Sequence, residues 1–429
     1  MKRTAPIFYG WTVVLTCLTG MVLIYGIRHS FSVFFTPILA EFGWSRGNVA
    51  MMLSLNILTY GFIAPVAGYF SDRWRARVPM TVGVLLLALA TAGCAFASEL
   101  RHFYLLFGIL MPLGTAFCGW PVYAPALMNW FYKRRGLVLG LAQMGGGLSM
   151  AYATFVGFLI EKVGWRVSFL ILAGTLIAVF LPLVFFFFRS HPRDKGLQAY
   201  GSDTPPPSAQ TPGKKIRREE LPAAEQTLPQ ILTSSKLWLL VLAYALCWGL
   251  AHYMVLAHQV RFLQDAGFST LYSSSMLALF GLMACIGQAT GFLSDWIGRR
   301  KAMTVATGAS LIGLAALLLI RDTSQPWLLY VFSVCCGYGA GLATPTIFAA
   351  SADRFHGRHF GTVGGLLLGG MGVGSILGPW FGGFLYDLWG NYTLAFILCM
   401  LSLIGSCLLV WAAAPRKDFH TAPARPRFS

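Results

Sequence analysis

Long apolar segments alternate with short polar ones along almost the whole chain. A helix of about 20 apolar residues is long enough to cross a bilayer, and twelve such segments can be placed in order. The pattern therefore predicts an all-α polytopic membrane protein with twelve transmembrane helices. The expected spans are residues 10–36, 47–70, 78–98, 103–128, 136–160, 166–188, 237–260, 271–293, 302–320, 326–350, 359–386 and 390–412.

The longest interruption of the apolar pattern lies in the middle of the chain. Residues 189–235 contain three consecutive prolines, Pro205 to Pro207, and a basic run from Lys214 to Arg218. Because this composition buries little apolar surface, we expect a cytoplasmic linker. The predicted organisation is a six-helix bundle at 1–188, the linker at 189–235, a second six-helix bundle at 236–412 and a cytoplasmic tail at 413–429.

The two expected bundles repeat each other in sequence. The segment from Gly68 to Asp72, after the second span, recurs 223 residues later from Gly291 to Asp295. A second set of matches has an offset of 224, which is nearly the same. Such repeats predict two pseudo-symmetric halves that rock about a central site. The second set pairs Pro121, Phe131, Arg134, Gly140, Gly145 and Gly146 with Pro345, Phe355, Arg358, Gly364, Gly369 and Gly370.

Composition and charge agree with a membrane protein. The chain is 56% hydrophobic and 11% charged, which leaves too little polar surface for a soluble globule. Its net charge of +17 does not indicate nucleic acid, because 25 of the 32 Lys and Arg residues fall in the termini and in alternate loops. The positive-inside rule then places both termini in the cytoplasm. The nine cysteines lie in the spans without metal-ligand spacing, so we expect no metal and no cofactor.

One polar stripe interrupts the first span. On a helix, Tyr25, Arg28, His29 and Ser32 fall at positions i, i+3, i+4 and i+7, on one face. An ionisable group at membrane depth costs at least ~2.5 kcal/mol, so it usually faces a cavity and marks a substrate or ion path. We therefore expect this stripe to line a substrate site.

The histidine of the stripe is duplicated in the second half. At an offset of 223, His29 corresponds to His252, whereas Arg28 corresponds to an alanine. An unperturbed imidazole titrates near ~6.5, and every carboxylate lies in an expected loop, in a tail or at a span end. We expect Arg28 to attract an anion, and the two histidines to carry a proton or hydrogen-bond the substrate. The alternatives are that Arg28 snorkels to the outer headgroups and that His29 only packs between helices.

Other polar side chains in the spans are candidates either for the substrate path or for ordinary interhelical hydrogen bonds. Glycine-rich stretches at 145–147 and 369–374 follow no expected strand, which favours close helix packing over phosphate binding. The candidate polar residues are Asn56, Tyr60, Tyr123, Gln143, Tyr253, Tyr338 and Thr346.

The repeated loop segment resembles the loop signature of the major facilitator superfamily. This resemblance implies the major facilitator fold. A glycine at the start of each segment lets a neighbouring helix approach closely, and the aspartate can pair with a cation or cap a neighbouring helix. The alternative is that the cations only fix the orientation of the chain. The predicted gating residues are Gly68, Asp72, Arg73, Gly291, Asp295, Arg299 and Arg300.

Three stretches are similar to signatures of the monocarboxylate transporter family and its bacterial relatives: residues 8–11, 30–35 and 130–145. Where that family has a lysine before the helix 1 ending, this chain has His29. Where its helix 8 carries an aspartate and an arginine, this chain has Met283 and Gly287. The resemblance implies transport of a small organic anion, but these departures leave the substrate class open.

We predict a secondary active transporter, not an enzyme, that imports a small monocarboxylate-like anion with a proton by alternating access. We expect a monomer in the bacterial inner membrane, with the lipid bilayer as its surroundings and no nucleic-acid partner. One alternative is an efflux antiporter for apolar or cationic compounds. The antiporter motif GxxxGPxxGG lies in helix 11, at Gly374 to Gly383, instead of helix 5, which weighs against it. Another alternative is a sensor that does not transport.

Overall fold

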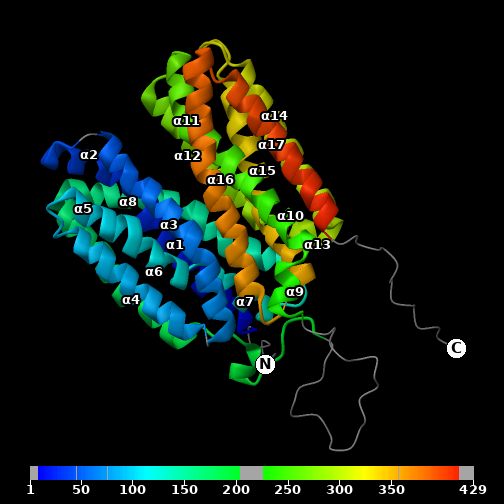
Figure 1. The fold of residues 1–429 in the computed structure, drawn as a ribbon. Helices are drawn as coiled ribbons and strands as arrows, with labels where there is room; N and C mark the ends of the chain where they lie inside the picture. The colour runs from blue at the N-terminus through cyan, green and yellow to red at the C-terminus, as the bar shows by residue number, and fades with distance from the viewer. Residues whose placement is uncertain (1–7, 45, 75, 203–225, 356, 415–429) are drawn as a thin grey trace, which may run out of the picture.

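The structure is a computed structural model that describes residues 8–44, 46–74, 76–202, 226–355 and 357–414. These residues form helices and no β-strand, apart from an isolated bridge between Phe131 and Tyr200. Figure 1 shows the blue-to-teal helices of the first half on one side and the green-to-red helices of the second half on the other. The predicted all-α fold of two halves is confirmed.

The helices of the two halves follow one another with short connections. The first half consists of α1 (Gly10–His29), α2 (Phe31–Phe42), α3 (Arg46–Arg73), α4 (Arg77–Cys94), α5 (Leu100–Phe103), η1 (Tyr104–Leu110), α6 (Met111–Cys118), α7 (Trp120–Trp130), α8 (Arg135–Thr175), η2 (Leu176–Phe180) and η3 (Leu183–Phe187). Then come η4 (Pro192–Lys195) and α9 (Leu228–Leu232). The second half consists of α10 (Ser235–Tyr244), η7 (Ala245–His252), α11 (Tyr253–Asp265), α12 (Thr270–Ala289), α13 (Phe292–Ile297), α14 (Arg299–Leu319), α15 (Trp327–Phe355), α16 (Phe360–Trp389) and α17 (Thr393–Ala413).

Ten helices of the described residues are long and apolar enough to cross a membrane. The other two expected spans coincide with the first part of α8 and with α12, which has a shorter apolar helix at Ser275–Ala289. The fifth and sixth expected spans both begin within the range of α8, which consists of two helices divided at Gly164. The φ of 80° and ψ of 163° at this residue are not helical, and a glycine adopts such a conformation readily.

The glycine clusters serve helix packing in both halves. A side chain at Gly145 would overlap the carbonyl of Leu18, and one at Gly370 would overlap the carbonyl of Val241. The expectation of close helix packing is therefore met.

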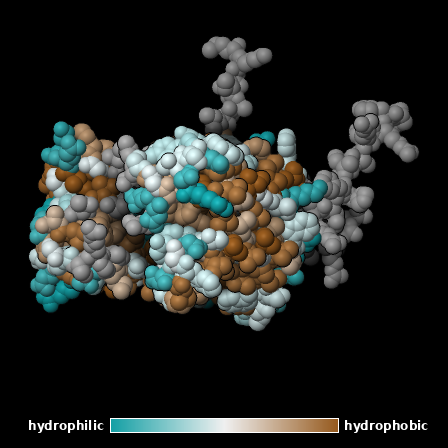
Figure 2. Space-filling model, turned by 90° about the horizontal axis from the view of Figure 1, so that it is seen from above, coloured by the Kyte–Doolittle hydropathy of each residue, from teal (hydrophilic) through white to brown (hydrophobic). Residues whose placement is uncertain are grey.

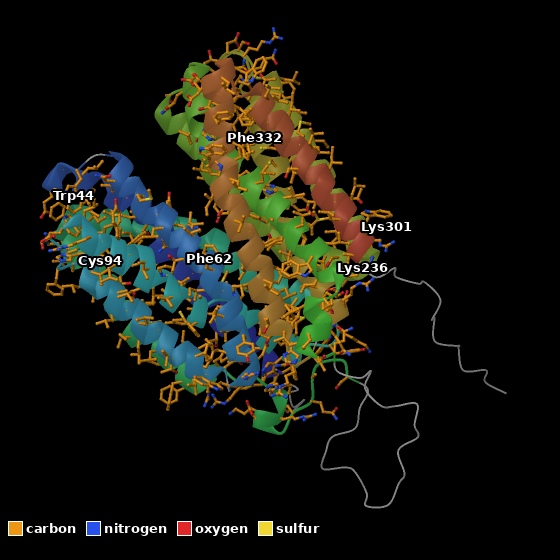
Figure 3. All side chains as sticks on the ribbon, in the orientation of Figure 1. Trp44, Phe62, Cys94, Lys236, Lys301 and Phe332 are labelled. Carbon is orange, nitrogen blue, oxygen red and sulfur yellow. The ribbon has the colours of Figure 1, made fainter. Side chains whose placement is uncertain are left out.

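The outer surface of the helices is largely apolar. The apolar residues Phe185 and Leu401, for example, are 61% and 60% exposed. Figure 2 shows broad brown, hydrophobic areas on the face that it presents. Such a surface suits contact with lipid chains. Figure 3 places Trp44 at one end of the molecule and Lys236 and Lys301 toward the other, where α10 and α14 begin.

The start of the expected linker packs onto the first half. The backbone N–H of Tyr200 donates to the carbonyl of Trp130 at 2.8 Å, and the tyrosine ring lies 5.7 Å from the ring of Phe8. Farther on, Ile231 is 3% exposed. Composition predicted a segment that buries little apolar surface, and a few aromatic and backbone contacts hold its described ends. The basic run at 214–218 lies outside the described residues.

Candidate substrate site and gate

Arg28 is buried within α1. Its side chain is 6% exposed, and its guanidinium carbon lies 5.1 Å from the ring centroid of Tyr60, over the ring face. Its Nη2 atom has no hydrogen-bond partner, and no acidic side chain of the described residues forms an ion pair with it. The side chain therefore lies in the interior and not at a headgroup surface. A buried cation without a counter-ion is costly, which makes it an anion-binding candidate.

Two tyrosines of the first half lie close to this arginine. The hydroxyls of Tyr25 and Tyr60 are 3.1 Å apart, and the guanidinium of Arg28 lies over the ring of Tyr60. Of the candidates in the second half, Tyr253 is the first residue of α11.

His29 is hydrogen-bonded to α8. Its Nδ1 lies 2.8 Å from the hydroxyl of Ser149, and that hydroxyl donates to the carbonyl of Gly146 at 2.5 Å. Because the serine proton is used in this way, Nδ1–H of His29 is the donor to the serine oxygen. In the neutral ring, Nε2 then carries the lone pair. Ser149 thus fixes the tautomer of His29, a role that the sequence analysis did not assign to it.

His252 has a similar arrangement with a different partner. Its Nδ1 lies 2.6 Å from the carbonyl of Cys247, and a carbonyl can only accept, so Nδ1–H donates. The ring is 1% exposed, and its Nε2 atom is buried without a partner in the part of the chain that the structure describes. This acceptor is therefore available to a ligand or a proton.

Some of the remaining candidate side chains form hydrogen bonds with other protein groups, and others do not. The amide of Asn56 donates to the carbonyl of Phe107 at 2.7 Å, and Thr346 donates to a carbonyl of its own helix at 2.7 Å. By contrast, the Tyr123 hydroxyl and Gln143 Oε1 are buried without a partner among the described residues. The hydroxyl of Tyr338 lies 3.2 Å from that of Thr290, and the side chain of Ser32 lies outside the described residues.

Asp72 caps a helix of the opposite half. Its carboxylate accepts hydrogen bonds from the backbone N–H groups of Gly361 and Thr362, both at 2.7 Å, and from the Thr362 hydroxyl at 2.6 Å. These groups lie at the N-terminus of α16, where the helix dipole favours negative charge. A side chain at Gly68 would overlap the carbonyl of Gly361, so both ends of the sequence segment contribute to this contact.

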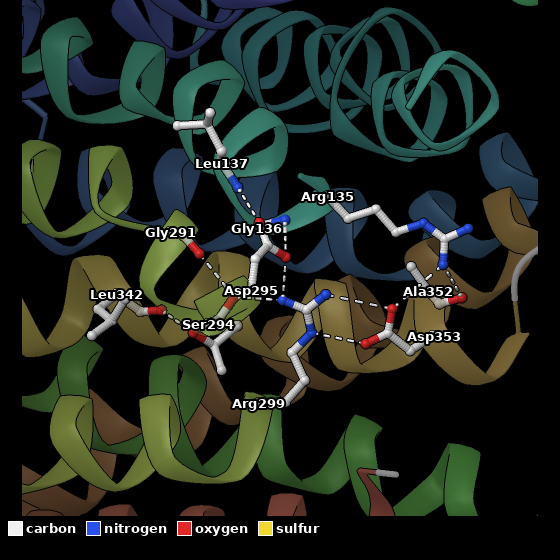
Figure 4. Close-up of polar contacts among 11 residues, drawn as sticks. Arg135, Gly136, Leu137, Gly291, Ser294, Asp295, Arg299, Leu342, Ala352 and Asp353 are labelled. Atoms are coloured by element: carbon white, nitrogen blue, oxygen red, sulfur yellow. Dashed lines mark hydrogen bonds and ion pairs between the residues drawn. The ribbon is translucent and has the colours of Figure 1, made fainter. Parts of the chain in front are cut away.

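Asp295 makes the reciprocal contact in the other direction. Its carboxylate accepts from the N–H groups of Gly136 at 3.0 Å and Leu137 at 3.2 Å, at the N-terminus of α8 (Figure 4). A side chain at Gly291 would overlap the carbonyl of Gly136. We call the end of the molecule that holds Asp72 and Asp295 the capped end. The two caps join the halves there.

Ion pairs strengthen the capped end on one side. Arg299 donates to Asp295 at 2.6 Å and to Asp353 at 2.8 Å, and Asp353 also lies 3.4 Å from Arg135 of the first half (Figure 4). Arg73 instead lies over the ring of Tyr69 on its own helix, 4.4 Å from the centroid. The sequence analysis did not identify Asp353 or Arg135 as part of this network.

Arg300, near the start of α14, contacts the end of the last helix, α17. Its Nη2 donates to the carbonyl of Ala414 at 2.8 Å. In the first half, Nε of Arg77 donates to the carbonyl of Phe188, also at 2.8 Å. Since the two arginines are 223 residues apart, this contact holds the final helix of each half and lies apart from the caps.

Two helical halves that meet at a capped end and enclose buried ionisable groups define a membrane carrier. A sequence profile of the Major Facilitator Superfamily matches residues 17–367 and 290–429. The chain belongs to the major facilitator superfamily. It is an integral, multi-pass membrane transporter and, as predicted, not an enzyme.

The relatives confirm the resemblance to monocarboxylate transporters. Monocarboxylate transporter 13 of Bos taurus is 27% identical over 413 residues, which cover 94% of this chain and 89% of that protein. Monocarboxylate transporter 11 of Homo sapiens is 28% identical over 426 residues, covering 95% and 83%.

Solved structures share the fold. The transporter FucP in the outward conformation has a TM-score of 0.70 at 15% identity and covers 93% of this chain and 98% of its own. The proton:xylose symporter XylE has a TM-score of 0.71 at 13% identity, covering 95% and 96%. At these identities the likeness supports the fold alone.

Proposed function

We propose that this transporter moves a small organic anion of the monocarboxylate type together with a proton. The observation that carries the proposal is Arg28, a residue that is 6% exposed and whose Nη2 has no hydrogen-bond partner among the described residues. An anionic group bound there supplies the missing counter-charge and forms a charge-assisted hydrogen bond. The same positive charge disfavours a cationic cargo.

The histidines are the proposed proton carriers, because no carboxylate lies within the described spans near Arg28. In His252 the position for the proton is Nε2, since Nδ1–H is already donated to Cys247. A carboxylate bound at Arg28 offsets the repulsion between the guanidinium and an imidazolium. Binding of the anion and binding of the proton therefore support each other, which is the thermodynamic basis of symport.

The caps at Asp72 and Asp295 are the proposed gate. Both join the halves at one end, so transport to that side requires both to break. Gly68 and Gly291 allow the close approach, and Arg299 holds Asp295 in place. The excess of basic residues in alternate loops supports a cytoplasmic position for this end and for both termini. We place the protein, as a monomer, in a bacterial inner membrane.

The test is uptake of labelled short-chain acids into proteoliposomes under an imposed pH gradient. Arg28→Gln and His29→Ala are compared with wild type and with Arg321→Gln, a control in an exposed loop. We expect at least a tenfold loss of uptake in Arg28→Gln and no change in the control. Unchanged uptake in both Arg28→Gln and His29→Ala would refute the site assignment. If wild type takes up none of the acids, the substrate class is wrong.

A further inference from the structure

Three cationic side chains meet at the end of α17, on the carbonyls of residues 412–414. Nζ of Lys236 in α10 donates to the first of these carbonyls at 3.1 Å, Nε of Arg354 in α15 donates to the second, and Nη2 of Arg300 in α14 donates to the third at 2.8 Å. Since the acceptors are consecutive, the three cations lie within about 10 Å, the diameter of a helix. We call them the basic cluster. Figure 3 shows Lys236, and Lys301 near it, at this end of the molecule.

The basic cluster carries more positive charge than the end of α17 can balance. The C-terminus of a helix is equivalent to about half a negative charge, whereas the cluster supplies three positive charges. Asp353, the acid next to Arg354 in the chain, pairs instead with Arg299 and Arg135, and no acid of the described residues forms an ion pair with the cluster. A lysine has three N–H donors and an arginine five, and each member of the cluster uses only one or two on the carbonyls. Charge and donors therefore remain for another partner.

The first half shows that this contact does not need the charge of Arg354. At the offset of 224, Arg354 corresponds to Trp130, and its acceptor Ala413 corresponds to Arg189. Nε1–H of Trp130 donates to the carbonyl of Arg189 at 2.7 Å. A side chain at the same place therefore holds the end of the final span in each half, with a neutral donor in the first half and a cation in the second. The charge in the second half has no part in holding the helix that a neutral group could not take.

Exposed tryptophans place the basic cluster at the surface of the membrane. Trp411 directly precedes the three acceptor residues and is 43% exposed, and Trp238, two residues after Lys236, is 51% exposed. The guanidinium carbon of Arg300 lies 5.7 Å from the ring centroid of Trp411. Tryptophan is enriched where lipid chains meet headgroups, so the cluster lies at the depth of the lipid phosphates. This depth favours a lipid headgroup over an anion from bulk solution.

We propose that the basic cluster binds the headgroup of an anionic phospholipid and prefers a headgroup with two phosphates. Phosphate oxygens accept charge-assisted hydrogen bonds from the remaining N–H groups, and basic pockets between membrane helices suit such headgroups. A surplus of about two positive charges matches two phosphates better than one. The bound lipid contacts side chains of α10, α14 and α15 around the end of α17, so it stabilises the packing of these helices in the second half.

The experiment measures the Kd of the purified full chain for cardiolipin, phosphatidylglycerol and phosphatidylcholine by native mass spectrometry. We expect wild type to bind cardiolipin at least tenfold more tightly than phosphatidylcholine, with phosphatidylglycerol between them. The double variant Lys236→Gln and Arg354→Gln removes two charges and keeps an N–H donor for each carbonyl, and it should weaken cardiolipin binding at least fivefold. The matched control, Arg193→Gln with Arg321→Gln, removes two charges from exposed residues elsewhere and should keep the wild-type affinity.

A second measurement uses only the wild-type protein and separates a lipid headgroup from a free anion. A ligand that binds the folded state raises the melting temperature, so cardiolipin should raise it, and inorganic phosphate at the same phosphate concentration should not. Equal stabilisation by inorganic phosphate would show a site for a free anion and overturn the assignment to lipid. Equal wild-type affinities for the three lipids, or an unchanged cardiolipin affinity in the double variant, would overturn the inference. These outcomes leave the proposed anion transport standing, because the uptake assay tests it separately.

Discussion

Replacing Asp72 by asparagine is a direct test of the caps. The carboxylate accepts three hydrogen bonds from the N-terminus of α16, at Gly361 and Thr362. Asparagine keeps one acceptor oxygen but places an NH2 group where the second oxygen accepted, facing backbone donors. It also removes the negative charge next to the helix N-terminus.

The expected effect follows from these two losses. Removing a helix-capping side chain costs about 0.5–2 kcal/mol, and removing a charge from a helix N-terminus costs about 0.3–1 kcal/mol. Because the cap joins the halves, the loss affects the conformation that is closed at the capped end and not the one that is open there. A change of about 1–3 kcal/mol shifts the equilibrium between them by roughly 5- to 150-fold.

Thiol labelling reads out this equilibrium. Cys285 is 4% exposed, and its thiol lies 3.7 Å from the carbonyl of Met144 across the contact between the halves. In a background in which the other cysteines are replaced, the rate of alkylation of Cys285 reports separation at the capped end. We expect Asp72→Asn to increase the rate at least fivefold. Asp322→Asn, an exposed acid far along the chain, is the control.

An unchanged labelling rate in Asp72→Asn would refute the reasoning, provided that the variant keeps the melting temperature of wild type. It would mean that the hydrogen bonds to α16 persist in both conformations or contribute equally to both. A slower rate would show that the aspartate favours separation, the opposite of the proposed role.

Three further predictions concern the helix contacts and the linker. Gly140→Ala introduces a side chain that overlaps a carbonyl of α12, so it should increase Cys285 labelling and reduce uptake, whereas Gly308→Ala, which meets no atom within 4 Å, should do neither. Ser149→Ala removes a hydrogen-bond partner of His29, worth about 1 kcal/mol, and should move the midpoint of the pH dependence of uptake. Tyr200→Pro removes the N–H that bonds to α7, and it should lower the melting temperature of the purified protein.

Much of the fold could be predicted from sequence because it depends on length and hydropathy. The twelve apolar segments and the repeat around Gly68 and Gly291 are both visible in one dimension. The break at Gly164 lies between the fifth and sixth expected spans, and the sequence did not show that a single non-helical glycine makes it. The sequence could not identify the groups that Asp72 and Asp295 cap, because these groups lie almost 300 residues from Asp72 and about 160 residues from Asp295.

The candidate site was less accessible to sequence reasoning. The partner of His29 is Ser149, 120 residues away, and nothing in the surroundings of a serine in an apolar segment identifies it. Arg354 of the basic cluster is different, since the offset of 224 found in the repeat also links it to Trp130. That signal was present in the sequence. What sequence could not show is that both side chains donate to a carbonyl at the end of the final span of their half.

The reciprocal caps also set how much free energy a substrate must supply. Each cap uses an aspartate of one half and a helix of the other, so a rotation that separates the halves breaks both. At about 1–3 kcal/mol for each cap, opening at that end costs about 2–6 kcal/mol from the caps. A ligand that binds both conformations equally contributes nothing to this work. If the caps are the gate, as proposed, tighter binding of the substrate to the open conformation offsets this cost, and the caps favour an empty carrier that is closed at the capped end.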